Sequence, residues 1–444
     1  MTVDDSKLTH RGTRSATRSD GGPVKLKPET MESFRLKVKE ITLRELNAEP
    51  FYYKWICAVT GLKKAQDLLT LTFIAYYFGS LALLWNWNYV FNSFDIDTYS
   101  WPMLSLWVGV WYSNIYFSFV GSVMTHNTMH TPLYRNTYAN RIIQLLLTLT
   151  YGHPVSSYVP GHNLSHHKFT QSKKDVMSTH LMQNESNLYN LLFFQPTVAL
   201  NVMQSDFRYI VYQKEQGNAT FVSQSLRELL FFLSVQGFLL YSHFGKALAF
   251  FWLPHFFAQY AIVTLSMLQH DGCEEFDSTD KYINFNTSRN FTSPLLNFFT
   301  LNNGYHTIHH LCPTSHWSIN KILHDELCVG HVDQRLNYAS MWQFVLDYYV
   351  NNGNPWNKNT VRCDYKGTPI KYFKLDFGAH VPGAFDNPNK AALGYQEWMN
   401  FPEGFVSDER IPTTKPRLIQ LIGILLVKLL ISPVYSIDPG LKLI

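Results

Sequence analysis

The sequence predicts an all-α integral membrane protein, with four transmembrane helices in two hairpins and a histidine-rich metal site on the cytosolic side. Two observations lead to this fold class. Long uncharged apolar runs occur in a chain that is 16% aromatic and only 16% charged, a balance that indicates contact with lipid. Histidines gather in three short groups that follow these runs. The net charge of +4 is small and dispersed, so no nucleic-acid binding is expected.

Composition divides the 444 residues into segments of different character. The first is polar, has mixed charge and lacks an apolar signal sequence, so we expect it to be disordered. Five cysteines without a CxxC pair argue against a disulfide framework or a zinc ribbon. We expect, in order, a disordered N-terminus (1–30), a partly helical basic cytosolic segment (31–66), a membrane domain with three histidine groups (67–325), a soluble C-terminal extension (326–415) and an apolar interfacial helix (416–444).

The first hairpin begins at Leu68. Leu68–Trp85 has no charged residue and is close to the length that crosses a bilayer as a helix. The linker 86–100 contains no Lys or Arg, and the uncharged run Trp101–Thr125 brings the chain back.

The second hairpin is expected from Leu229–Phe244, a turn at Gly245-Lys246, and a return over Ala247–Leu268. Two other apolar runs, Ile142–Tyr151 and Leu191–Leu200, are too short to span a bilayer, so we expect interfacial or half-buried helices there.

Two hairpins place both termini and all the histidine groups on one side of the membrane. That side carries nearly all the Lys and Arg residues, which the positive-inside rule assigns to the cytosol. The endoplasmic reticulum is the default location for such a protein.

The histidine groups are an HxxxH pair, an HxxxHH triple and an HxxHH triple. With 18 histidines in 444 residues, one such pair is expected roughly 0.7 times by chance, but a given triple only about 0.03 times. A further histidine follows the fourth predicted span. Imidazole binds iron, zinc, copper or nickel, and nine converging imidazoles exceed the needs of one ion, so two ions are expected. The candidate ligands are His126, His130, His162, His166, His167, His270, His306, His309 and His310.

Metal-bound histidines usually donate their second ring nitrogen to a carboxylate or carbonyl. Three nearby side chains are candidates for this role, namely Asp175, Asp271 and Asn303. A pair of iron ions at the lipid interface could activate O2 beside an apolar chain, because a substrate would reach it from the bilayer without crossing water. Such chemistry requires electrons from outside.

With its three histidine boxes behind hydrophobic hairpins, the chain resembles the membrane fatty acid desaturase family over roughly Leu68 to Trp317. The resemblance implies a four-span bundle with a cytosolic di-iron site, O2 as co-substrate, and a fatty acyl lipid or acyl thioester as substrate. It also implies a separate electron donor such as cytochrome b5 or ferredoxin. His270 matches a histidine that the acyl-CoA desaturases supply after the fourth span, but Ser266 stands where they have asparagine. Gly152-His153-Pro154 is followed by Val155, so a fused haem domain with an HPGG motif is not expected.

Two alternatives to a desaturase remain open on the sequence. The same ligands could serve a hydroxylase or ketolase of this superfamily that acts on lipid, sphingoid or carotenoid substrates. The chain could also be a non-catalytic membrane protein that keeps a structural metal site.

Overall fold

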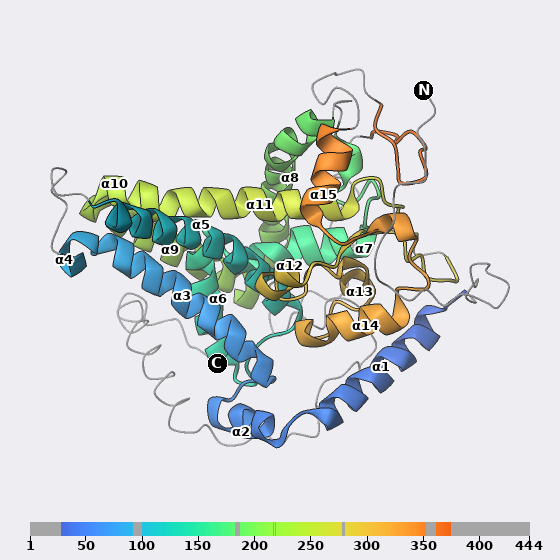
Figure 1. The fold of residues 1–444 in the computed structure, drawn as a ribbon, viewed down its shortest axis with the longest axis horizontal. Helices are drawn as coiled ribbons and strands as arrows, with labels where there is room; N and C mark the ends of the chain where they lie inside the picture. Colours follow the sequence, from blue (N-terminus) through green and yellow to red (C-terminus); the bar gives the residue numbers. More distant parts are fainter. Residues whose placement is uncertain are drawn as a thin grey trace.

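The computed structural model of the chain is mostly helical (Figure 1). It describes residues 28–91, 100–182, 187–215, 217, 219–277, 280–351 and 361–373. The predicted disordered segment 1–30, apart from its last three residues, and the predicted interfacial helix 416–444 lie outside this part of the chain.

Most of the long helices run side by side and form one elongated bundle (Figure 1). The helix α5 is central, because it packs against α3, α6 and α11. The helices of this part are α3 (Leu68–Trp85), α4 (Trp87–Phe91), α5 (Trp101–His130), α6 (Thr137–Tyr151), α8 (Asn187–Glu215), α9 (Ala219–Ser242), α10 (Phe244–Ala247) and α11 (Leu253–His270).

Two helical stretches are long and apolar enough to cross a membrane, Ala65–Trp85 and Phe244–His270. They coincide with the first and fourth predicted spans. Only 33% of the residues in the most apolar window of each are buried, so much of their apolar surface is uncovered. The helices α5 and α9 occupy the other two predicted spans. In α5 the residues that lower its overall hydropathy face inward, since Asn114, Ser118 and Ser122 are fully buried.

The second hairpin turns earlier than predicted. Ser242 ends α9, and His243 is the single residue before α10, so the predicted turn at Gly245-Lys246 is wrong and lies inside a helix. Beyond α10 the chain continues through a π-helical turn, η7 (Leu248–Trp252), into α11. Pro254, which lacks an N–H donor, is the second residue of α11 and directly follows this π-helical turn.

The apolar run Leu191–Leu200 belongs to a longer helix than expected. It lies inside α8, whose 29 residues include Pro196.

By contrast, the run Ile142–Tyr151 corresponds closely to α6. This helix begins where the Asn136 side chain accepts hydrogen bonds from two backbone N–H groups. It ends at Gly152, which adopts a left-handed conformation (φ 79°) and where a Cβ would collide with the ring of His255.

Short elements gather at one end of the bundle and form a cap over it (Figure 1). Its helices are α7 (His167–Phe169), α12 (Pro294–Phe299), α13 (His306–Leu311), α14 (Asn320–Leu327) and α15 (Met341–Val345). Shorter helical turns are η2 (Ala65–Asp67), η4 (Val155–Ser157), η5 (Val159–His166), η6 (Thr179–Leu181), η8 (Trp317–Ile319), η9 (Gln334–Leu336) and η10 (Leu346–Val350). Two short strands, β1 (Asn290–Phe291) and β2 (Asn337–Tyr338), pair in parallel.

The N-terminal segment packs against this cap. The helix α1 (Met31–Ala48) contributes Phe34, Val38 and Ile41 to an apolar core shared with residues of α13 and α14. The helix α2 (Phe51–Thr60) follows it and buries none of its residues. Residue 325, the predicted end of the membrane domain, lies between β1 and β2 in the sequence, and these two strands pair with each other.

Candidate metal centre

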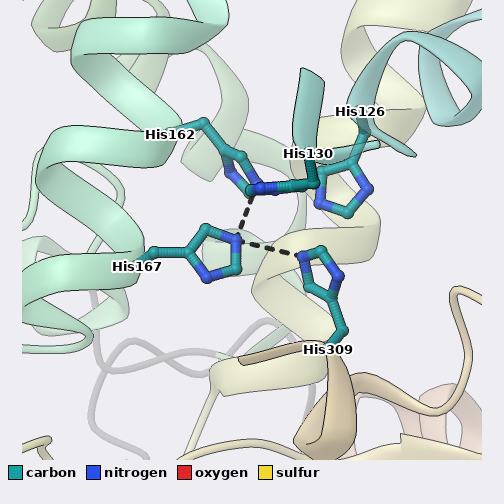
Figure 2. Close-up of side chains that lie close together, drawn as sticks. All are labelled: His126, His130, His162, His167 and His309. Carbon is teal, nitrogen blue, oxygen red and sulfur yellow. Dashed lines mark hydrogen bonds between the residues drawn. The ribbon is translucent and has the colours of Figure 1, made fainter. Parts of the chain in front are cut away.

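All nine histidines singled out from the sequence come together, and they form two clusters. In each cluster the ligand nitrogens lie within 4.8 Å of one another. Figure 2 shows the five imidazoles of the first cluster turned toward one another from separate segments. We call the sets the five-histidine cluster (His126, His130, His162, His167 and His309) and the four-histidine cluster (His166, His270, His306 and His310).

The first histidine box lies in the last turn of α5. His126 and His130 are one helical turn apart, so both point to the same side, and both are buried. Both belong to the five-histidine cluster.

The second box is divided between the clusters by a change in helical geometry. Residues 159–166 form the π-helix η5, in which backbone hydrogen bonds join residues five positions apart, so that each turn is wider than in an α-helix. In an α-helix, side chains five positions apart point roughly 140° away from each other. Here the Nε2 atoms of His162 and His167 lie 3.0 Å apart in the five-histidine cluster, and His166 joins the other one.

The third box is divided by ordinary α-helical spacing. His306 and His310 are four residues apart on α13, and their Nε2 atoms lie 3.1 Å apart in the four-histidine cluster. His309 points to the other cluster, where its Nε2 lies 3.0 Å from that of His167. Gly304, just before the box, lets the backbone pass close to β1, because a Cβ there would collide with the carbonyl oxygen of Phe291 and the side chain of Asn297.

The two clusters are adjacent. The rings of His167 and His310, which belong to different clusters, stack with their centroids 4.4 Å apart. His310 is half-buried, whereas the other eight imidazoles are buried.

Hydrogen bonds at the second ring nitrogen fix which nitrogen faces the cluster. His166 Nδ1 donates to the Asp175 carboxylate (3.0 Å), and His270 Nδ1 donates to the Thr287 carbonyl oxygen (2.9 Å), because these oxygens only accept. In the neutral rings, both Nε2 atoms therefore present lone pairs, yet they lie 3.2 Å apart. Two facing lone pairs repel, so this arrangement fits a cation between them.

The spacing of the nitrogens also fits metal coordination. Closest Nε2–Nε2 distances within the clusters run from 2.9 to 3.3 Å. Nitrogens that bind one divalent ion at about 2.1 Å and at right angles to each other lie about 3 Å apart. The residues therefore fit two metal ions with all-imidazole ligands.

Burial favours the neutral form of five cluster imidazoles that lie outside the long helices. Desolvation, followed by the proximity of the other histidines, lowers the pKa well below its usual value for His162, His167, His306, His309 and His310. A neutral ring has a lone pair free for a metal ion. Burial tends to raise the pKa of Asp175, but His166 and the backbone N–H groups of Gln171 and Met177 outweigh it and hold this pKa below its usual range.

Of the three candidate partners for the imidazoles, the structure brings one to a histidine. Asp175 is fully buried and binds His166. The carboxylate of Asp271 instead binds Arg362 and the Tyr349 hydroxyl. The side-chain oxygen of Asn303 is buried with no hydrogen-bond partner within the described ranges.

Sequence reasoning missed three partners of the imidazoles. The side-chain oxygen of Asn127 accepts from His126 Nδ1 (3.2 Å). Thr170 donates its hydroxyl hydrogen to the His166 carbonyl and accepts from His310 Nδ1 (3.3 Å). Thr287 contributes only its backbone carbonyl to His270, so the identity of its side chain carries no signal in the sequence.

Comparisons with known proteins agree with this geometry. The sequence pattern of the family described as "Fatty acid desaturase" matches residues 99–338, more than half of the chain. The matched stretch contains all nine histidines. A comparison with curated proteins found no match.

Proposed function

Since the chain belongs to the fatty acid desaturase family, we propose that it is an oxygen-dependent desaturase that introduces a double bond into a fatty acyl chain. The observation that carries this proposal is the pair of adjacent, buried, all-histidine clusters. A structural metal site would need only one cluster of about four ligands. Two abutting sites are the arrangement expected of a centre that acts on O2.

Each cluster would hold one iron ion. When bound, the iron pair would supply the activation of O2 and the removal of hydrogen from an unactivated methylene. The protein's own residues position the ions and exclude water: eight of the nine imidazoles are buried, and Asp175 and the Thr287 carbonyl orient His166 and His270.

We further propose that α3, α5, α9 and the stretch from α10 to α11 cross the membrane as four spans, with the histidines on the cytosolic side. Large apolar side chains on the outside of α5 and α9 support this proposal, among them Tyr112 (70% exposed), Phe238 (67%) and Tyr241 (92%). Such an uncovered apolar surface is typical of contact with lipid. Terminal tags that are accessible in sealed, cytosol-side-out microsomes of the endoplasmic reticulum would test both the topology and the location.

The proposed reaction needs two partners. An acyl chain would enter from the bilayer, carried as a lipid or an acyl thioester. Electrons would come from a separate donor protein such as cytochrome b5 or ferredoxin. Among the nine cluster histidines, all of them in the described part of the chain, His310 alone is half-buried rather than buried, which favours electron entry there.

The experiment compares total lipids from a host that expresses the wild-type chain with lipids from the same host expressing His306→Ala. His306 belongs to the four-histidine cluster, so its loss should abolish product while the protein remains in the membrane. Mass spectrometry should find acyl chains lacking two hydrogens only with the wild type. A gain of one oxygen would instead indicate a hydroxylase, and product retained by His306→Ala would exclude the proposed centre.

A further inference from the structure

Gln171 occupies an unusual position beside the four-histidine cluster. It is fully buried and adopts a left-handed backbone conformation (φ 67°), which residues other than glycine rarely do. Strained backbone of this kind persists only where the surroundings hold it, and it is concentrated at functional sites.

The hydrogen bonds of Gln171 join the two segments that carry His166 and His270. Its backbone N–H donates to the Asp175 carboxylate (2.9 Å), which accepts from His166 through the same oxygen. Its side-chain Nε2 donates to the backbone carbonyl of His270 (2.7 Å) and to the Thr179 hydroxyl (2.7 Å). One residue therefore contacts the supports of two imidazoles in the same cluster.

The same network extends to Arg362, which lies in the segment 361–373, beyond the residues matched by the family. Its guanidinium forms a buried ion pair with Asp271, the residue after His270. It also donates to the Thr179 carbonyl oxygen (3.2 Å), and Thr179 donates its backbone N–H to the Gln171 side-chain oxygen (2.8 Å). Arg362 thus fixes both the end of α11 and the loop that holds Gln171.

We propose that Gln171 and Arg362 are positioning residues for the four-histidine cluster, and that the C-terminal segment 361–373 is therefore part of the metal centre. The proposal rests on the proposed function. Its physical basis is that the Nε2 atoms of His166 and His270 present facing lone pairs 3.2 Å apart. Without a rigid support the two segments would separate, and His166 and His270 could no longer bind the same ion. Within the described residues, no hydrogen bond joins Gln171 or Arg362 to an imidazole of the five-histidine cluster, which should therefore keep its ion.

The test measures iron per chain and the Mössbauer spectrum of purified, 57Fe-loaded wild type, Arg362→Gln and Gln171→Gly. Glycine suits the left-handed backbone at position 171 and keeps the N–H that binds Asp175, so this variant removes only the side-chain bonds. We expect iron to fall from about two ions per chain to about one, and the spectrum to change from a coupled pair to an isolated ion. The matched control is Arg44→Gln, which removes an exposed arginine paired with Glu326 and should keep both ions.

Adding His306→Ala to Gln171→Gly should remove no further iron, because both changes act on the same cluster. Two irons with the wild-type spectrum in Gln171→Gly would overturn the inference, as would further loss in the double variant. If Arg362→Gln aggregates because it leaves Asp271 as an unpaired buried carboxylate, Gln171→Gly alone decides. A wild-type protein without two irons would reject the proposed function itself.

Discussion

Replacing Asp175 with asparagine tests how the second ring nitrogen of His166 controls the metal site. The carboxylate accepts three hydrogen bonds: Oδ2 from His166 Nδ1 and the Gln171 N–H, and Oδ1 from the Met177 N–H. Asparagine has only one acceptor oxygen. Its best orientation keeps the two bonds at the Oδ2 position and turns the NH2 group toward the Met177 N–H, so at least one buried donor loses its partner at a cost of about 1–3 kcal/mol.

The variant also loses the negative charge that supports His166. Removing such an outer partner weakens metal binding about 10- to 100-fold. The assay is competition for iron with a soluble chelator, followed as iron per chain against chelator concentration. We expect one of the two ions to leave Asp175→Asn at a 10- to 100-fold lower chelator concentration than it leaves the wild type. Asp325→Asn, which changes an exposed carboxylate paired with Lys321, is the control. Coincident curves for wild type and Asp175→Asn would refute the reasoning.

Three further predictions concern stability. Gly304→Ala should lower the unfolding free energy by about 1–3 kcal/mol or prevent folding, because its Cβ would overlap Phe291 and Asn297; a melting temperature equal to that of the wild type would contradict this. Burial lowers the pKa of His324 to about 4, against 6.5 in the unfolded chain, so between these values only the unfolded chain binds the proton and stability falls as pH drops from 6.5 to 4. His324→Gln should therefore make the fall of the melting temperature in that window less steep, and a slope as steep as that of the wild type would exclude the assignment. Removal of metal by a chelator should lower the melting temperature and readdition of iron should restore it, because only the folded state assembles the clusters; an unchanged temperature would argue against metal in the native protein.

The ligand set could be predicted from sequence because chance does not produce two histidine triples at these spacings. Its division into two clusters could not, since it depends on the π-helical turn at residues 159–166, for which the sequence has no clear marker. The HxxHH box was easier, because α-helical spacing alone sends His306 and His310 to one side.

Long-range contacts account for the remaining differences. Asp271 directly follows the candidate ligand His270, which made it a candidate partner for an imidazole. In the structure its carboxylate instead binds Arg362, 91 residues away in sequence. Likewise, Gln171 has no local feature that predicts a left-handed backbone, because tertiary hydrogen bonds hold it there. Apolar content predicted where the long helices lie. It placed the second hairpin turn within α10, because composition alone does not mark His243, the single residue at which the helix is interrupted.

The π-helical turn in the second box changes what a histidine motif encodes. At unchanged length, α geometry from His162 to His167 would bring His166 to the side of His162 and turn His167 roughly 140° away, with the same number of imidazoles. The letters of the motif thus specify the donors, while the pitch of the backbone specifies which cluster each donor joins. Deleting one residue between His162 and His166 would instead give the HxxHH spacing of the third box, for which α geometry alone makes the same division between the clusters.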